Sequence, residues 1–428
     1  MARLSVDRES LLGPGEGLMR LVGMWQPQEA ACRLVPAARG CLTLVSIAFL
    51  TVSAALKLCV DTPQELEELA QCFCIAIVCG LLWTRVALFI EHGTTFRQLI
   101  QLLIKTRVQY NEVAGDECKR RRCQRHVERL YLLLKVAVVT GLIDWLSSPL
   151  VSRALLGDDE SGRQLPLPLW LPGDVYVSPT YEILYAAQCV ALTIASVCSF
   201  CTDIFFIHLM QVIGTEFEVL SDNFSAVQNS YEQPARARDR GELSEYQTTK
   251  ETLVLSCAKI YADCVSGEQM HRQLAKNIQH HQILLRSISL LQTTMSVPIF
   301  FVLAINIVNL CGNLFISIVL LQRDGNLSKA SKTLLTIPPL LCETGMFCIF
   351  GHALTDQSEK LMQSAFSCGW TESDVRFRRS LLTFMTALVR PVEITVGKTT
   401  KLSKETLVQV LNGTYGLLNL LYHFHSSV

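Results

Sequence analysis

The sequence predicts an all-α, polytopic membrane protein with seven transmembrane helices, and three observations support this prediction. Half of the 428 residues are hydrophobic and only 18% are charged, which is too apolar for a soluble protein of ordinary composition. Seven apolar segments are long enough for a helix to cross about 30 Å of hydrocarbon. The charges that flank these segments alternate as inside and outside loops do.

The predicted spans follow one another along the whole chain. The fifth has no charge from Ser287 to Gln322, so we expect it to tilt, to kink at Pro298 or to extend beyond the bilayer. The seventh carries no Asp, Glu, Lys or Arg after Glu405. The seven spans cover residues 38–58, 69–90, 130–151, 180–209, 285–321, 333–354 and 404–425.

Loop charges predict the orientation, because Lys and Arg concentrate in cytoplasmic loops. Residues 92–130 hold nine Lys or Arg against four acids, whereas residues 58–68 hold four acids and no base. The segment from Arg376 to Lys404 is again basic. We therefore expect a cytoplasmic N-terminus and an extracellular C-terminus, which is the inverse of a G-protein-coupled receptor.

The charge pattern divides the chain into parts. Within the long cytoplasmic connection, Glu232–Glu251 is polar and contains Pro234 and Gly241, which predicts a loop or insertion. Its flanks, near 210–230 and 256–283, are helical in pattern and with Glu372–Leu388 form either a subunit interface or solvated helices. The predicted parts are 1–37 (cytoplasmic N-terminal segment), 38–211 (spans one to four), 212–284 (cytoplasmic connection), 285–354 (spans five and six), 355–403 (cytoplasmic anchor region) and 404–428 (last span).

Catalytic and metal-binding signatures are absent from the sequence. It has no Gly-rich phosphate loop, HExxH or G-x-S-x-G pattern, so we expect neither an enzyme nor a cofactor. The 17 Cys are scattered, and no CxxC pair lies beside a second pair or a His cluster, which argues against zinc. A net charge of zero gives no sign of nucleic-acid binding. The polar first ten residues indicate no cleavable signal peptide.

Several motifs occur in a characteristic order and spacing. The chain begins with a Gly-x-Trp-x-Pro motif at Gly23–Pro27 and ends with the block from Trp370 through Arg390-Pro391 to Thr414-Tyr415. Between them lie Pro166–Pro172, Pro179, Tyr181, Tyr185, Gln188, Asp203, His281, Cys311, Cys342 and Ser358. In this order the motifs resemble the insect odorant receptor family, whose members form ligand-gated ion channels.

The resemblance implies an odorant-gated, non-selective cation channel subunit in the plasma membrane of a sensory neuron dendrite. It implies a small volatile odorant as ligand, and a hetero-tetramer with the family's shared co-receptor in the lipid bilayer. That co-receptor is longer, with a larger insertion before span five, so this chain resembles a tuning subunit.

Three other classes are weighed against this interpretation. Gustatory receptors end in Thr-Tyr, five apolar residues and Gln-Phe, whereas here Leu421-Tyr422 stands at that spacing. A gustatory-type channel remains an alternative, as does a G-protein-coupled receptor. The third span is not followed by Asp/Glu-Arg-Tyr, and Asn419–Tyr422 lacks the expected proline. Without an inverted repeat, a transporter is disfavoured.

Candidate ligand-binding residues lie mainly in the outer halves of the spans. Gly141 and Trp145 share one helical face with Val138 beside them. A Gly that opens space and a Trp that forms an apolar wall suit a small volatile ligand, while tight packing with Trp145 as an interfacial anchor is the alternative. The full predicted set is Cys74, Ile77, Val138, Gly141, Trp145, Cys189, Thr193, Asn306 and Asn309.

Polar residues inside the spans form a second group of candidates. Asn306, Asn309 and Asn313 share one face of span five, so they face protein or water and not lipid. They either form interhelical hydrogen bonds or contribute to a pocket or aqueous vestibule. Acids within apolar runs are functional candidates, and here they are Asp144, Asp203 and Glu343.

The resemblance implies that the last span lines a pore. Its predicted pore and gate residues are Leu418, Leu421 and Tyr422, because an apolar ring blocks ions by dewetting. The alternative is that these side chains face lipid. The sequon at Asn326 falls in a predicted outside loop and is expected to be glycosylated.

Overall fold

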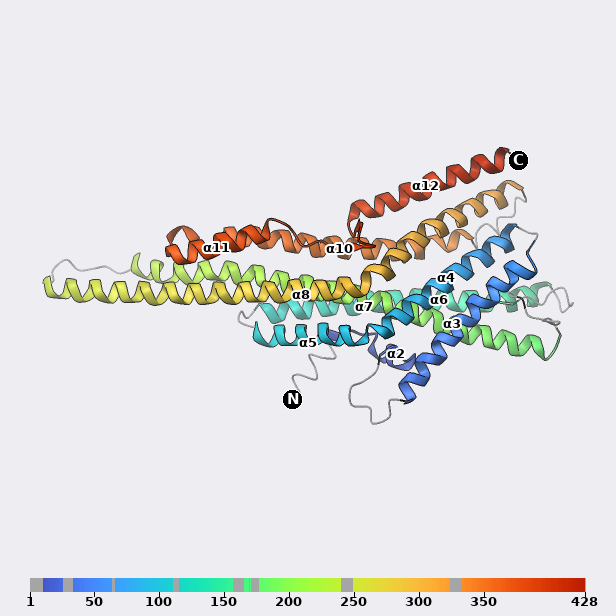
Figure 1. The fold of residues 1–428 in the computed structure, drawn as a ribbon, viewed down its shortest axis with the longest axis horizontal. Helices are drawn as coiled ribbons and strands as arrows, with labels where there is room; N and C mark the ends of the chain where they lie inside the picture. The colour runs from blue at the N-terminus through green and yellow to red at the C-terminus, as the bar shows by residue number, and fades with distance from the viewer. Residues whose placement is uncertain are drawn as a thin grey trace.

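The computed structural model describes residues 11–25, 34–63, 66–110, 115–156, 165–168, 170, 177–239, 249–323 and 333–427. Over these residues the chain is helical apart from short turns and a two-stranded β-hairpin. The helices run broadly along one axis and form an elongated bundle (Figure 1). The predicted all-α class is confirmed.

Each predicted span falls on a helix of its own. In order, these helices are α3, α4, α6, α7, α8, α10 and α12. The elements are α2 (Glu16–Leu21), α3 (Leu34–Val60), α4 (Leu66–Glu91), α5 (Gly93–Gln109), α6 (Asp116–Leu156), α7 (Thr180–Asp239), α8 (Thr249–Arg323), α10 (Ile337–Phe366), η2 (Trp370–Glu372), α11 (Val375–Leu388), β1 (Thr395–Val396), β2 (Thr400–Lys401) and α12 (Lys404–Ser427).

Six helices in the described part of the chain are long and apolar enough to cross a membrane, namely α3, α4, α6, α7, α8 and α10. The helix α12 has 24 residues, which is sufficient length. It is not among those six, since polar residues such as Asn412, Asn419 and His423 interrupt its apolar sequence. The last predicted span therefore needs a polar environment on part of its surface.

Two helices extend far beyond the thickness of a bilayer. α7 has 60 residues and α8 has 75, which at 1.5 Å per residue corresponds to lengths of about 90 and 110 Å. Their ends form a stem together with α11, at the side of the bundle away from α3 and α4 (Figure 1).

The predicted loop at Glu232–Glu251 is wrong at both ends. The helix α7 continues to Asp239 and α8 begins at Thr249, so only residues 240–248 lie outside the described residues. The residues at the end of α7 are mostly Glu, Gln, Ala and Arg, which favour helix, and this preference outweighed the loop signal of Pro234.

The basic segment between α4 and α6 was predicted only as a loop, yet it contains α5. Four apolar residues recur at i, i+3, i+4 and i+7 along this helix, and all are buried: Phe96, Leu99, Ile100 and Leu103. This periodicity predicts an amphipathic helix, and we overlooked it because the segment is rich in charge.

An aromatic cluster packs α4, α5 and α7 together near the N-terminal residues. The ring of Phe89 lies 4.8 Å from Phe96 and 5.3 Å from Phe205, measured between centroids. Trp25 of the Gly-x-Trp-x-Pro motif lies 6.3 Å from Phe205. Gly23 has a φ of +74°, and a Cβ there would lie 2.3 Å from the backbone nitrogen of Gly40. The motif therefore needs a glycine to bring Trp25 against the bundle.

The β1–β2 hairpin fixes the start of α12 against α8. The backbone N–H of Gly397 donates to the hydroxyl of Ser296, at 3.1 Å. Gly397 has a φ of +61°, and a Cβ there would lie 2.4 Å from the ring of Phe300. The backbone N–H of Leu402 donates to the carbonyl of Ile394 at 2.9 Å. The hairpin thus aligns α12 with the upper part of α8 (Figure 1).

Candidate functional site

Hydrogen bonds join the predicted outer ends of α6 and α7 to residues 165–170. The indole N–H of Trp145 donates to the carbonyl of Pro166 at 3.1 Å. The side chain of Gln188 accepts from the N–H of Leu167 at 3.1 Å and donates to its carbonyl at 3.0 Å. The hydroxyl of Tyr185 donates to a carbonyl of α6. Trp145 thus anchors the segment that contains Pro166 to α6.

The predicted ligand-binding residues of α6 are divided between two environments. Val138 packs against the apolar core. Gly141 is exposed, and a Cβ added there would meet no atom within 4 Å. Trp145 is 42% exposed. In a single chain, Gly141 and Trp145 therefore border the outer surface of the bundle and not an enclosed space.

The other predicted ligand-binding residues lie on α4, α7 and α8. α7 packs against both α4 and α6, and α8 packs against α4. The half-buried residues are Cys74, Ile77 and Cys189, the exposed one is Thr193, and the buried ones are Asn306 and Asn309. Their membership of one pocket remains a prediction, because the two hollows described below are lined by other residues.

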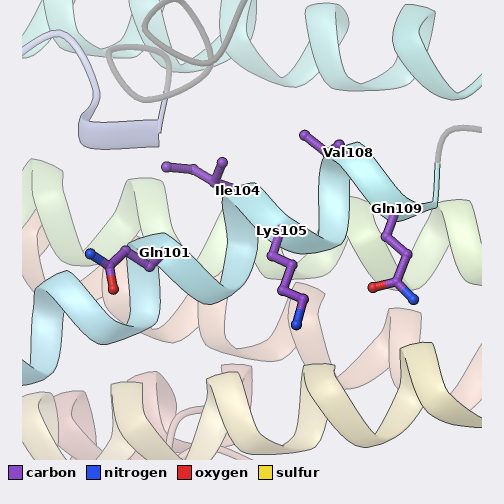
Figure 2. A pocket seen from close by; sticks show the side chains of 5 residues that line it. All are labelled: Gln101, Ile104, Lys105, Val108 and Gln109. Carbon is purple, nitrogen blue, oxygen red and sulfur yellow. The ribbon is translucent and has the colours of Figure 1, made fainter. Parts of the chain in front are cut away.

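A hollow of about 410 Å³ runs along α5 (Figure 2). All five of its lining residues belong to this one helix, and they are Gln101, Ile104, Lys105, Val108 and Gln109. Figure 2 shows Ile104 and Val108 projecting to one side of the helix and Lys105 and Gln109 to the other. An open depression of this kind does not enclose a small ligand as binding pockets do.

A buried polar cluster connects four helices inside the bundle. Arg85 of α4 is 5% exposed and forms an ion pair with Asp203 of α7. Its Nη1 atom also lies 3.7 Å from Oε1 of Glu343 on α10. Asn306 of α8 donates from Nδ2 to Oε2 of Glu343 at 3.3 Å, and to the hydroxyl of Thr344 at 3.0 Å. We call these five residues the Arg85 cluster.

The Arg85 cluster strongly favours one arrangement of its helices. A charge removed from water is tolerated only when it is paired, and removing one member of a buried pair costs about 3–5 kcal/mol. Sequence analysis singled out Asp203, Glu343 and Asn306 but missed Arg85. A lone Arg within an apolar span was the available signal, since such a residue needs a partner in the bundle.

The amide of Asn306 is thus used in an interhelical hydrogen bond. Asn309 is buried on the same face of α8. Asp144, the third predicted intramembrane acid, is exposed on α6. Of the acids noted in the sequence, Asp203 and Glu343 are the two that meet a buried base.

A second ion-pair cluster lies in the stem. Glu216 of α7 is fully buried and accepts two bonds from Arg120 of α6, at 2.9 and 2.8 Å. Arg107 of α5 adds a contact at 3.3 Å. His280 of α8 stacks on Tyr110 with 4.3 Å between ring centroids, and burial lowers the pKa of His280 to about 4. The ring is therefore neutral at pH 7. The basic residues of 92–130 predicted the orientation but not this ion-pair cluster.

One face of α12 is covered by the chain and the other is not. Thr406, Val410 and Thr414 recur every four residues and are buried, where α12 packs on α8 and α10. Of the predicted gate residues, Leu418 and Leu421 are half-buried and Tyr422 is exposed. Tyr422 shares the uncovered face with Leu411 and Tyr415, whereas Leu418 and Leu421 follow Thr414 at i+4 and i+7 beside the covered face.

The predicted glycosylation site Asn326 lies outside the described residues. Within the part of the chain that the structure describes, no group of three or more His, Cys, Asp or Glu side chains could hold a metal ion.

The chain matches a known protein family over most of its length. Residues 65–415 match the family described as 7tm Odorant receptor. The chain is 28% identical over 163 residues to Odorant receptor 42a of Drosophila melanogaster, which covers 38% of this chain and 39% of that protein. It is 24% identical over 304 residues to Odorant receptor 85c of Drosophila melanogaster, covering 70% and 68%. The match with Odorant receptor 10 of Aedes albopictus covers 60% of each protein.

Solved structures share the fold over nearly the whole chain. The olfactory receptor OR5 from Machilis hrabei, in complex with eugenol, superposes with a TM-score of 0.74. The identity is 14%, and the match covers 99% of this chain and 98% of the other. A second structure of the same receptor superposes with a TM-score of 0.74 at 13% sequence identity.

Replacing Arg85 with Met is expected to lower the stability of the bundle by about 3–5 kcal/mol, because Asp203 and Glu343 then face each other without their base. Melting of the purified full chain in detergent, followed by size-exclusion chromatography, measures this loss. The control Lys401→Met breaks an exposed pair with Glu393 and costs under about 1 kcal/mol.

Adding Asp203→Asn and Glu343→Gln to Arg85→Met removes the unpaired charges, so this triple variant recovers part of the loss. If Arg85→Met melts at the same temperature as the wild type, the Arg85 cluster does not hold the helices together.

Proposed function

This chain belongs to the odorant receptor family, and we propose that it is an odorant-binding, tuning subunit of an odorant-gated, non-selective cation channel. The observation that carries the proposal is the family match from residue 65 to residue 415. The shared fold with OR5 over 99% of the chain supports it. Membership places the protein among receptors and not among enzymes.

The chain is a multi-pass membrane protein, which we place in the plasma membrane of a sensory neuron dendrite with a cytoplasmic N-terminus. The basic residues at the start of α6 and before α12 support this orientation. The stem of α7, α8 and α11 then lies in the cytoplasm, where a subunit interface can form without lipid.

The proposed ligand is a small volatile odorant held in the outer half of the bundle among α4, α6, α7, α8 and α10. One receptor of similar fold was solved in complex with eugenol. The half-buried Cys74, Ile77 and Cys189 and the inward-facing Val138 provide apolar contacts on three of these helices. The ligand opens the channel only as far as it binds the open state more tightly than the closed one.

The proposed pore is lined by the uncovered face of α12. An apolar and aromatic helical face that its own chain leaves uncovered is suited to meet the axis of an assembly. Four such helices, contributed by this chain and the co-receptor in a hetero-tetramer, would form an apolar ring at Tyr422, with the half-buried Leu418 and Leu421 beside it. Such a ring resists wetting when it is narrow.

The helix α8 is suited to couple the proposed odorant site to the proposed pore. Asn306 belongs to the Arg85 cluster, and the next residue, Ile307, lies against α12, within 3.9 Å of where a Cβ of Gly413 would stand. A shift of α8 caused by a ligand therefore reaches both the Arg85 cluster and the pore helix through adjacent residues.

Replacing Trp145 with Ala is expected to raise the half-maximal odorant concentration by about ten-fold, since an apolar wall of the pocket is lost. Trp145→Phe keeps the ring but removes the donor to Pro166, so it separates ligand contact from anchoring. The measurement is the odorant dose–response at matched surface level, with Ile143→Ala as an exposed control on the same helix. Equal effects of Ala and Phe, or no effect of Gly141→Trp, would remove this face of α6 from the pocket.

Replacing Leu418 with Ser is expected to raise the current without odorant and to change relative cation permeability, because a polar side chain eases wetting of the ring. The rank order of odorants stays nearly the same, since the pocket is elsewhere. Recordings at matched surface level check this for Leu418→Ser and Tyr422→Ala. Leu420→Ser is the control, about 200° around the helix from Leu418. Unchanged permeation in both variants would place this face of α12 away from the pore.

A further inference from the structure

A second hollow, of about 320 Å³, lies where α6, α7 and α10 meet. Two of its lining residues are cationic, namely Lys119 and Arg122, and His126 lines it as well. Three others are large and apolar, namely Met210, Phe350 and Leu354. We call it the inner basic pocket, and neither the odorant site nor the gate proposed above uses it.

The inner basic pocket lies at one border of the predicted membrane spans. Its α6 residues come just before the span that begins at residue 130. Met210 follows directly after the span that ends at residue 209, and Leu354 is the last residue of the span that ends there. The three helices therefore bring the ends of three spans to the same level, at the side predicted to be cytoplasmic. The pocket meets both the acyl region and water.

The charges around the inner basic pocket are unevenly distributed, because both neighbouring acids pair with Lys119. Lys119 lies 2.9 Å from Glu218, which also lines the pocket, and 2.5 Å from Asp222. Arg122, by contrast, is exposed and forms no ion pair with a residue of the described ranges. Arg125 and Arg129 follow it at i+3 and i+7 on the same helical face. The side of the pocket that carries Arg122 therefore attracts an anion.

A hydrogen-bond donor in the wall needs an acceptor. Gln211 lines the inner basic pocket, and its side-chain nitrogen is shielded from solvent and donates to no atom of the residues that the structure describes. Most buried polar groups in proteins are hydrogen-bonded. An oxygen atom of a ligand in this pocket would accept from Gln211 while its charge faces Arg122.

We propose that the inner basic pocket binds the phosphate of an anionic phospholipid from the cytoplasmic leaflet. Basic pockets between transmembrane helices on that side bind lipid head groups. Arg122 pairs with the phosphate, Gln211 donates a hydrogen bond to it, and Met210, Phe350 and Leu354 contact the apolar part of the lipid. Inorganic phosphate shares the charge but lacks that apolar part, so the apolar wall favours the lipid. The leaflet, though not the pocket, rests on the proposed orientation.

The test is a titration of the purified full chain in detergent with dioctanoyl phosphatidylserine, dioctanoyl phosphatidylcholine or sodium phosphate, with binding followed by thermophoresis. Wild-type protein is expected to prefer the serine lipid. Arg122→Gln should weaken that binding about five-fold, since one basic residue near anionic lipid contributes about 1 kcal/mol. Gln211→Leu should weaken it as well. The choline lipid carries the same phosphate, but its ammonium group offsets that charge, so Arg122→Gln should weaken its binding less.

Arg121→Gln is the matched control, because Arg121 is exposed on the same helix, pairs with Glu117 at 3.0 Å and does not line the pocket. It should leave binding unchanged. Equal weakening by Arg121→Gln and Arg122→Gln would show general charge attraction and overturn the proposal, as would equal binding of the two lipids by wild type. Sodium phosphate binding as tightly as the serine lipid would overturn the lipid assignment. The titration needs neither odorant nor current, so its failure is distinct from a failure of the channel proposal.

Discussion

The pairing of Arg85 with Asp203 and Glu343 is the constraint on which the arrangement of the bundle depends. Lipid provides no hydrogen bonds, so a charge within a span must find its partner on another helix. Here the partners come from α7 and α10, and Asn306 adds α8 through Glu343. Apolar packing between these helices is not specific by itself, because lipid tails offer similar contacts. The Arg85 cluster selects one packing.

The same constraint suggests how the bundle switches between states. A buried ion cluster has few alternative arrangements, and a change in one helix is therefore passed on as a discrete step to the others. Ile307 follows Asn306 directly and lies against α12 at Gly413, so the Arg85 cluster is one residue away from a contact with the proposed pore helix. A second buried ion-pair cluster does the same in the stem, where Arg120, Arg107 and Glu216 join α5, α6 and α7.

The sequence revealed the helices more readily than their contacts. Hydropathy located the six helices that are apolar enough to cross a membrane and a further helix at the last predicted span, and the order of motifs indicated the family. The periodic pattern of α5 was present but was hidden by its charges, and the helical preference of the α7 end outweighed Pro234. Asp203 and Glu343 were identifiable as unusual, but their shared base was not, because pairing across α4, α7 and α10 depends on tertiary packing. For the same reason, the sequence placed Gly141 and Trp145 on one face without showing that this face borders the bundle surface.

The central claim is that odorant binding opens an ion pore without an intermediate signalling protein. The most direct measurement is current from outside-out membrane patches excised from cells expressing this chain with the co-receptor, tested against an odorant panel in GTP-free solution. The account predicts odorant-dependent cation currents that persist after excision and are absent from patches with the co-receptor alone for the same odorants. Responses in intact cells that vanish on excision and return with GTP would contradict it.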